Sequence, residues 1–197
     1  IELLVDSTSS PGNMPGRIAF LTTPTAASFP VERMRINRNG LVGINATPET
    51  YLDVNGDLAL REGSLVLVNG ANNNLVTANN PFPARKSFFR ITGPTSDYTI
   101  SGLTGGQDGR VLILFNDATD TLTVLNSSTA SNPSNRIQTA GGDIIVPVKG
   151  VVVFQYSTTL SRWIVISLNN GYPSVSGPTG ATGATGSVGA TGPAGAT

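Results

Sequence analysis

The 197-residue sequence contains no cysteine and no histidine. This excludes disulfide bonds, thiolate nucleophiles, imidazole acid–base catalysis and the usual zinc ligands from the chain. Charged residues make up only 12% of it, with 12 Lys plus Arg and 12 Asp plus Glu, so no net field favours nucleic acid or an anionic membrane. The longest apolar runs, 111–115 and 151–154, are too short to cross a bilayer. We therefore expect no nucleic-acid partner, no membrane insertion and no cofactor.

What the chain does contain is a strict glycine period at its C-terminal end. Seven unbroken Gly-X-Y triplets begin at Gly177, Gly180, Gly183, Gly186, Gly189, Gly192 and Gly195. Polyproline-II strands wind into a triple helix only when the residue at the common axis has no side chain. A flexible linker needs no such phase. The period therefore predicts a collagen-like triple helix with these glycines at its axis, and hence a homotrimer.

The tail also indicates what precedes it. Only Pro178 and Pro193 stiffen the triplets, and most Y positions are threonine, so the segment has little intrinsic preference for the triple helix. A folded trimeric domain upstream would hold three chain ends together and lower the cost of association. We therefore expect a trimerising domain before Gly177. Because Ile1 is not an initiator methionine and the tail ends on a complete triplet, we expect the natural chain to extend beyond both ends.

The rest of the sequence has almost no helical periodicity. Short β-branched or aromatic segments alternate with Gly, Asn, Asp and Pro, and Asn-Gly dipeptides at 39–40, 55–56 and 69–70 suit the positive φ angles of type I′ hairpin turns. Val-Asn-Gly recurs at 54–56 and 68–70, an echo that fits hairpins stacked along a fibre axis. The sequence thus predicts an all-β trimeric fibre of short antiparallel strands and hairpins, followed by the triple helix.

Two composition breaks divide the chain. They predict a turn-rich β fibre-shaft segment at 1–69, an Asn/Pro-rich linker at 70–83 and a β-sandwich-like trimerisation domain at 84–168. A second linker at 169–176 and the collagen-like segment at 177–197 follow. Within the third of these, runs at 111–115, 151–154 and 163–166 are apolar at consecutive positions, which is typical of strands buried on both faces. Such strands require either a two-sheet sandwich or a sheet whose second face packs on neighbouring subunits. Because a trimer is already predicted, packing on neighbouring subunits is the natural choice. In the shaft, Arg33 and Arg35 alternate with Met34 and Ile36, which indicates a strand with one solvated and one packed face.

Residues 16–60 carry a specific string of motifs. The string begins with Gly-Arg-Ile-x-Phe at 16–20 and Pro-x-Glu-Arg-Met-Arg-Ile at 30–36. It continues with Asn-Gly at 39–40, a segment that starts Val-Gly-Ile and ends at a proline at 42–48, and Leu-Asp-Val-x-Gly at 52–56. This string resembles a segment common in bacteriophage tail fibres and related virion appendages. Asn45 stands where that family usually has glycine, and the following loop is shorter, so we expect the local turn to differ.

Residues 97–163 are similar to a second β-module of such fibres. The shared features are a Gly-x-x-Gly-led hydrophobic strand at 106–114, Thr-Leu-Thr-Val, Asn-Arg-Ile at 135–137, Gly-Gly-Asp-Ile at 141–144 and Arg-Trp at 162–163. Together the resemblances imply a structural, non-enzymatic homotrimer in a tail or head fibre of a virion, an extracellular appendage. Its partners would be copies of itself, other virion proteins and a host-surface glycan or protein receptor.

Two other functions stay open. A bacterial or large-virus collagen-like surface adhesin would use the same modules, and a secretion signal or anchor in the flanking sequence would favour it. A glycan-degrading tailspike would need a long β-helix with clustered carboxylates, for which this chain is short and acid-poor. Asp117 and Asp120 could form a calcium loop or a glycosidase pair, but a hairpin loop with solvated carboxylates is the favoured interpretation.

Aromatic residues are the remaining candidates for a ligand surface. Carbohydrate and receptor sites often use aromatic planes, and Tyr98, Tyr156, Trp163 and Tyr172 are available, as weak candidates. For Trp163, which precedes an apolar strand, core or intersubunit packing is the favoured interpretation. The Gly-rich segment 102–109 lacks the Lys-Ser/Thr of a phosphate-binding loop and predicts a turn. We assign no catalytic, metal-binding or cofactor-binding residue.

Overall fold

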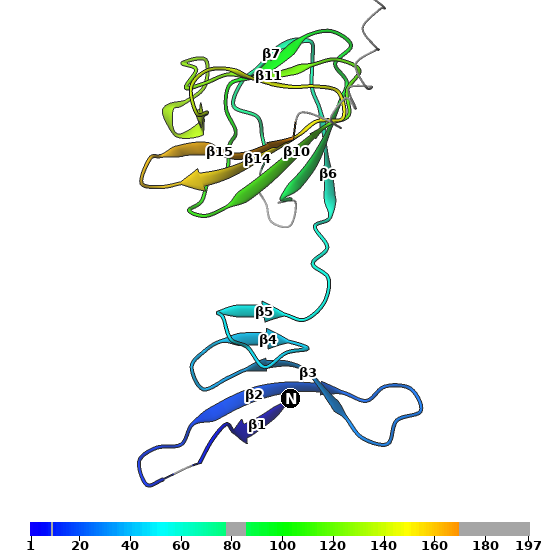
Figure 1. Cartoon of the computed structure of the whole chain (residues 1–197), viewed down its shortest axis with the longest axis vertical. Coiled ribbons are helices and arrows are strands. Elements are labelled where there is room, and N and C mark those ends of the chain that lie inside the picture. The colour runs from blue at the N-terminus through cyan, green and yellow to red at the C-terminus, as the bar shows by residue number, and fades with distance from the viewer. Residues whose placement is uncertain (9, 78–85, 170–197) are drawn as a thin grey trace, which may run out of the picture. The chain divides into compact units, whose positions relative to one another are not determined.

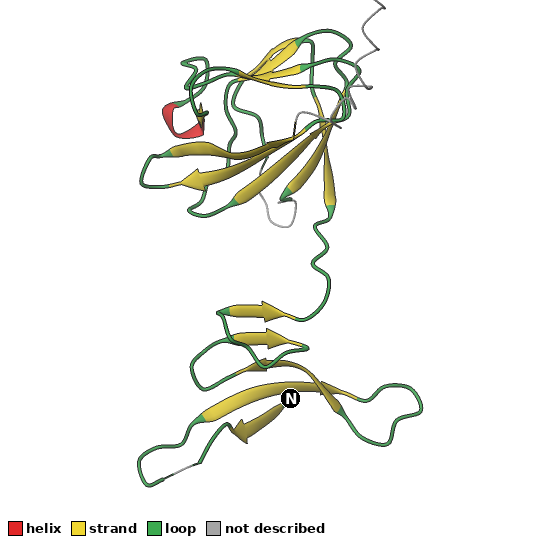
Figure 2. Cartoon of the chain, viewed as in Figure 1, coloured by secondary structure: helices red, strands yellow, loops and turns green. Residues whose placement is uncertain are grey.

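A computed structural model describes residues 1–8, 10–77 and 86–169 (Figure 1). Among these residues the only helix is a single 3-10 turn at Pro133–Asn135, and everything else is strand, turn or loop (Figure 2). The all-β fold expected from the sequence is therefore confirmed for the described residues. The chain divides into two units, Ile1–Leu60 and Arg61–Thr197. The Gly-X-Y tail, with the seven glycines predicted to lie on the triple-helix axis, is outside the described residues.

The N-terminal unit, Ile1–Leu60, is one five-stranded sheet in which each strand pairs with the next along the chain. Its strands are β1 (Glu2–Val5), β2 (Gly16–Thr22), β3 (Val31–Ile36), β4 (Val42–Ile44) and β5 (Leu52–Val54). The first four are antiparallel neighbours, whereas β4 and β5 pair in parallel. A register shift after Phe20 pairs Leu21 with Glu32, so Arg33 is the extra residue of a β-bulge. The shaft segment is thus a sheet of short strands, as its punctuation by turn residues predicted, although the parallel β4–β5 pair departs from the antiparallel pairing expected.

The Asn-Gly dipeptides do not form the predicted type I′ turns, which need positive φ at both residues. At 39–40 and 69–70 only the glycine has positive φ, +78° in each case, and at 55–56 neither residue does. The β3–β4 turn is held by Asn37, whose carbonyl accepts from the Gly40 amide and whose side chain accepts from the amide of Leu41. Asn45 has a φ of +54°, the left-handed region that glycine adopts most easily. Asparagine therefore takes a backbone conformation here that glycine favours.

The second unit is a β-solenoid of about four turns. Each of the first three turns places one strand in a six-stranded sheet and the next in a four-stranded sheet. These strands are β6 (Glu62–Val66) with β7 (Gly70–Asn72), β8 (Phe88–Thr92) with β9 (Tyr98–Ile100), and β10 (Val111–Asn116) with β11 (Leu122–Val124). Successive turns stack in parallel register: Glu62 on Phe88 and Phe88 on Ile113 in one sheet, Gly70 on Tyr98 and Tyr98 on Leu122 in the other.

The last turn reverses direction. After the 3-10 turn come β12 (Ile137–Gln138), β13 (Ile144–Val146), β14 (Val151–Ser157) and β15 (Arg162–Asn169). β13 and β14 pair antiparallel with β11 and β10, and β14 and β15 form a hairpin. The expectation of antiparallel strands and hairpins is therefore wrong for the first three turns. Consecutive strands there belong to opposite sheets, so each strand pairs with the one a full turn away, in parallel.

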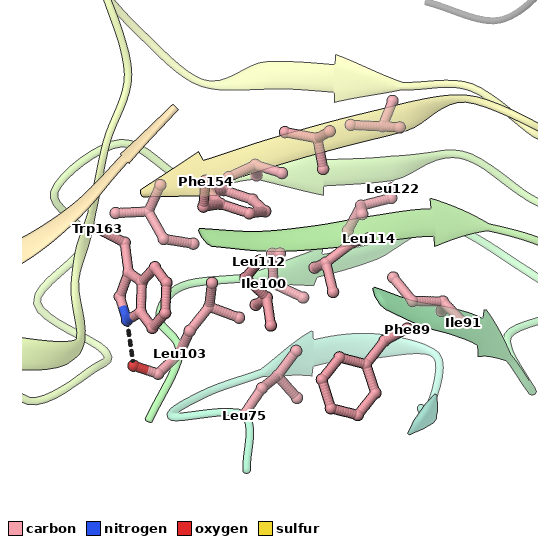
Figure 3. Packing of buried hydrophobic residues seen from close by; sticks show 14 of the residues in the cluster. Leu75, Phe89, Ile91, Ile100, Leu103, Leu112, Leu114, Leu122, Phe154 and Trp163 are labelled. Atoms are coloured by element: carbon pink, nitrogen blue, oxygen red, sulfur yellow. Dashed lines mark hydrogen bonds between the residues drawn. The ribbon is translucent and has the colours of Figure 1, made fainter. Parts of the chain in front are cut away.

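The hydrophobic core lies between the two sheets (Figure 3). Phe89, Ile91, Leu112, Leu114 and Phe154 of the six-stranded sheet lie in one buried cluster with residues of the four-stranded sheet, such as Ile100 and Leu122. One chain therefore closes this core between two sheets of its own, the possibility that the sequence analysis did not prefer. The two layers belong to a β-solenoid and not to the β-sandwich expected from the sequence. The core extends to Leu67, just after β6, so β6 and β7 belong to this unit. The division accordingly falls after Leu60, earlier than the composition break at Gly70.

One polar side chain ties the turns together inside this core. Asn116, at the end of β10, is fully buried. Its Oδ1 accepts hydrogen bonds from the Tyr98 hydroxyl (2.6 Å) and the Ala118 amide (3.1 Å). Its Nδ2 donates to the carbonyl oxygens of Asp120 (2.9 Å), Val146 (3.1 Å) and Pro147 (3.2 Å). The amide thus joins the second turn to the third and to the reversed fourth.

Candidate functional site

The three aromatic candidates for a ligand surface are inside the solenoid. Tyr98 is 1% exposed, Tyr156 8% and Trp163 not at all. The Trp163 indole Nε1 donates to the Leu103 carbonyl at 2.8 Å (Figure 3), and its ring meets Tyr156 edge to face with centroids 5.3 Å apart. Burial raises the pKa of the Tyr98 hydroxyl, and the Asp120 carboxylate adds to this effect. Tyr98 and Trp163 satisfy their polar atoms within the core, and none of the three rings is open to a ligand. The weak ligand-surface assignment made from sequence is therefore corrected, and for Trp163 the packing that the sequence favoured is found. Tyr172 lies outside the described residues.

The acidic pair is engaged by the protein itself. Asp117 forms ion pairs with Lys149 and with Arg90, the latter at 2.7 Å, and Asp120 accepts a hydrogen bond from the Thr121 amide. The hydrogen bond from Lys149, followed by that from Arg90, holds the pKa of Asp117 below its usual value. Within residues 1–8, 10–77 and 86–169 there is no cluster of three His, Cys, Asp or Glu side chains that could hold a metal ion. Nothing in the arrangement favours the calcium or glycosidase interpretation over a structural loop.

The Gly-rich segment 102–109 is also structural. A Cβ on Gly106 would lie 2.2 Å from the Tyr156 ring, so glycine is needed for packing there. The Arg110 guanidinium donates to the Gly105 carbonyl at 2.6 Å and to the Thr77 carbonyl at 2.9 Å, and it lies 5.6 Å from the centre of the Trp163 ring. The segment therefore closes one end of the core, in line with the turn predicted from sequence.

The features left for a functional site are two apolar sheet faces. On the N-terminal sheet, the strand registers align apolar side chains in two cross-strand rows on the same face. These rows are Leu3–Ile18–Ile36–Val42–Leu52 and Phe20–Met34–Ile44–Val54. Leu3 is 81% exposed, Leu52 62% and Ile44 40%, while the other six side chains are half-buried. We call this surface the shaft face.

The opposite face of the same sheet has a different chemistry. Its central row is Glu2–Ala19–Arg35–Gly43–Asp53. Arg35 pairs with Glu32, and Arg17 with Asp6 at 3.3 Å. The following loop packs over Gly43, where an added Cβ would lie 2.3 Å from the Ala46 carbonyl oxygen. This face is charged and covered in part by its own chain, so the apolar shaft face is the side of the sheet that lacks a cover.

The outer face of the solenoid's six-stranded sheet is the second apolar surface. Phe88, Ile113 and Val153 form one cross-strand row on it, and Phe115 and Val151 are neighbours in the next. All five side chains are half-buried. Charges border the patch at one end, where Arg90 pairs with Glu62 at 3.2 Å and Lys149 lies 5.8 Å from the centre of the Phe115 ring. An apolar centre with a charged rim is typical of a protein–protein interface.

The sequence carried a clear signal for these faces. The doubly apolar runs at 111–115 and 151–154 correctly marked β10 and β14, whose second face remains apolar outside the core. The alternation at Met34 and Ile36 predicted a packed face for β3. Ile18 and Phe20 of β2 follow the same period of two, but no packed face was predicted for that strand. The packed side expected for β3 is present as an apolar face.

Comparison with known proteins does not place the chain in a protein family. No protein-family model matches the chain, and a search of curated proteins gives no matching relative. In the part of the chain that the structure describes, no helix is long and apolar enough to span a membrane.

Proposed function

We propose that this chain is a structural component of a trimeric fibre on a bacteriophage or phage-like virion, in a tail or head fibre, where it contributes to attachment to the host surface. The observation that carries the proposal is the unbroken glycine period from Gly177 to Gly195, because a triple helix requires three chains. The virion assignment rests on the resemblance of residues 16–60 and 97–163 to segments of such fibres.

The two apolar sheet faces support a trimer independently of the tail. Monomeric proteins rarely leave large contiguous apolar patches in water, and such patches mark interaction sites. Both units of this chain carry one, and each lies on one face of a β-sheet. Three copies held side by side would bury these faces and deliver three chain ends to the start of the triple helix. The role is then mechanical: rigid trimeric modules hold a recognition surface away from the particle.

A collagen-like adhesin on a bacterial or large-virus surface is the second candidate. The glycine period and the apolar faces fit it equally well, since both concern assembly and not the surface that carries the fibre.

Immunogold electron microscopy separates the two candidates. Antibodies raised against the purified chain would be applied to virions and to uninfected cells of the culture that produces the protein. We expect gold on a thin appendage of the virion, and we expect the antibodies to reduce adsorption of virions to host cells. Labelling confined to the surface of uninfected cells would overturn the virion assignment and favour the adhesin.

A further inference from the structure

The N-terminal sheet has no second layer of its own. Among the described residues of Ile1–Leu60, the buried apolar side chains are Ala19 and Pro48. Ala19 lies on the face opposite the shaft face, and Pro48 packs on Gly43 of that same face. An isolated sheet in water needs another layer against its apolar side, because strands alone bury too little surface to be stable. The solenoid differs, since its two sheets enclose a core within one chain. The cover for the shaft face must therefore come from outside this unit.

The sequence limits what that cover can be. Three chains in a triple helix run parallel, so three copies of this chain would be related by one threefold axis. Threefold symmetry then turns the same face of each sheet toward the axis. The charged face, with Arg17 paired to Asp6 and Arg35 to Glu32, suits the outside, because its ions are already paired. The shaft face suits the inside, since its two rows carry no charge from Leu3 to Leu52.

We propose that the shaft face of β1–β5 is the contact through which three copies of this chain pack around a common axis. This proposal rests on the proposed trimer but is more specific, because the solenoid and the tail could also hold three chains together. Burial of the shaft face would supply the N-terminal sheet with the core that it lacks. The sheet is then ordered only when the copies meet, whereas the solenoid can fold as a single chain.

The absence of native cysteine allows a direct test in the full chain. Single cysteines would be placed on the shaft face, as Ile44→Cys and Leu52→Cys, and on the opposite face of the same sheet, as Leu21→Cys. Leu21 lies one residue beyond Phe20 and pairs with Glu32, so it is a matched apolar control. In one chain Ile44 and Leu52 are the more exposed, at 40% and 62%, whereas Leu21 is half-buried. Without a cover, the shaft-face thiols should react faster.

The measurement is the rate of maleimide labelling under native conditions, with the molecular mass of each variant taken by sedimentation. We expect trimers in which both shaft-face cysteines react at least about tenfold more slowly than Leu21→Cys and react fully only after denaturation. A trimer in which either shaft-face cysteine reacts as fast as Leu21→Cys would overturn this contact and leave the trimer standing. A monomer would overturn both the contact and the trimeric fibre. Two shaft-face positions are used so that a local effect of one substitution does not decide the result.

Discussion

Replacing Asn116 by leucine removes the amide that joins three turns of the solenoid while keeping the side chain's approximate size. The Tyr98 hydroxyl then loses its acceptor, and the carbonyl of fully buried Val146 loses a donor. A buried polar group left without a partner costs about 1–3 kcal/mol, so these two losses together should destabilise the fold by about 2–6 kcal/mol. At roughly 4–8 °C per kcal/mol for a domain near 100 residues, the melting temperature should fall by at least about 8 °C.

The assay is thermal unfolding followed by circular dichroism, with wild type and variants at one protein concentration because assembly makes the midpoint concentration-dependent. The matched control is Asn69→Leu. Asn69 accepts hydrogen bonds from the amides of Thr95 and Ser96 at an exposed corner, where water can replace it, so we expect a loss of no more than about 1 kcal/mol. If Asn116→Leu melted no lower than Asn69→Leu, the reasoning that the buried amide holds the turns together would be refuted.

Three further changes test other parts of the structure. A fragment of residues 61–169 should fold, whereas one that begins at residue 84 lacks β6 and β7 and should show no cooperative melt by circular dichroism. The hydrogen bond from Lys149 lowers the pKa of Asp117, so the folded state favours the ionised carboxylate. The contribution of this carboxylate to folding stability is therefore present above the usual pKa of an aspartate and is lost as the pH falls through the lowered pKa of the folded state. The melting temperature of wild type should therefore fall more steeply between about pH 5 and pH 3 than that of Asp117→Asn. Gly186→Val would place three β-branched side chains at the triple-helix axis. Limited proteolysis should then cut faster within residues 176–197, while the melting transition of the β-units stays unchanged. Identical digestion of wild type and variant would argue against the triple helix.

The sequence was sufficient for what depends on neighbouring residues. Short β-branched segments between turn residues predicted strands, and alternation along Arg33–Ile36 predicted that β3 would have one apolar and one charged face. The doubly apolar runs predicted that β10 and β14 would be buried on both faces; one face of each lies in the core, and the other is largely half-buried in the single chain. These properties follow from local periodicity, because the side chains of a strand alternate between its two faces whatever the strand pairs with.

The pairing of strands could not be predicted in the same way. Asn69-Gly70 looks like a hairpin turn, yet it is a corner between β6 and β7, which lie in different sheets, and the Asn69 side chain is used by the next turn of the solenoid. Turn residues specify that the chain bends, but the partner of β6 is β8, a full turn away. The burial of Trp163 likewise depends on the register of β15 against β14, which shifts at a bulge between Val153 and Phe154. Such distant contacts decide whether an aromatic side chain lies in the core or on the surface.

Trimerisation is the central claim, and sedimentation equilibrium of the whole chain at several micromolar concentrations tests it most directly. The glycine period and the two apolar sheet faces predict one species of about 61 kDa, three times the 20.3 kDa of a single chain. A folded species of 20.3 kDa at every concentration would contradict the trimer, and with it both the fibre and the shaft-face contact.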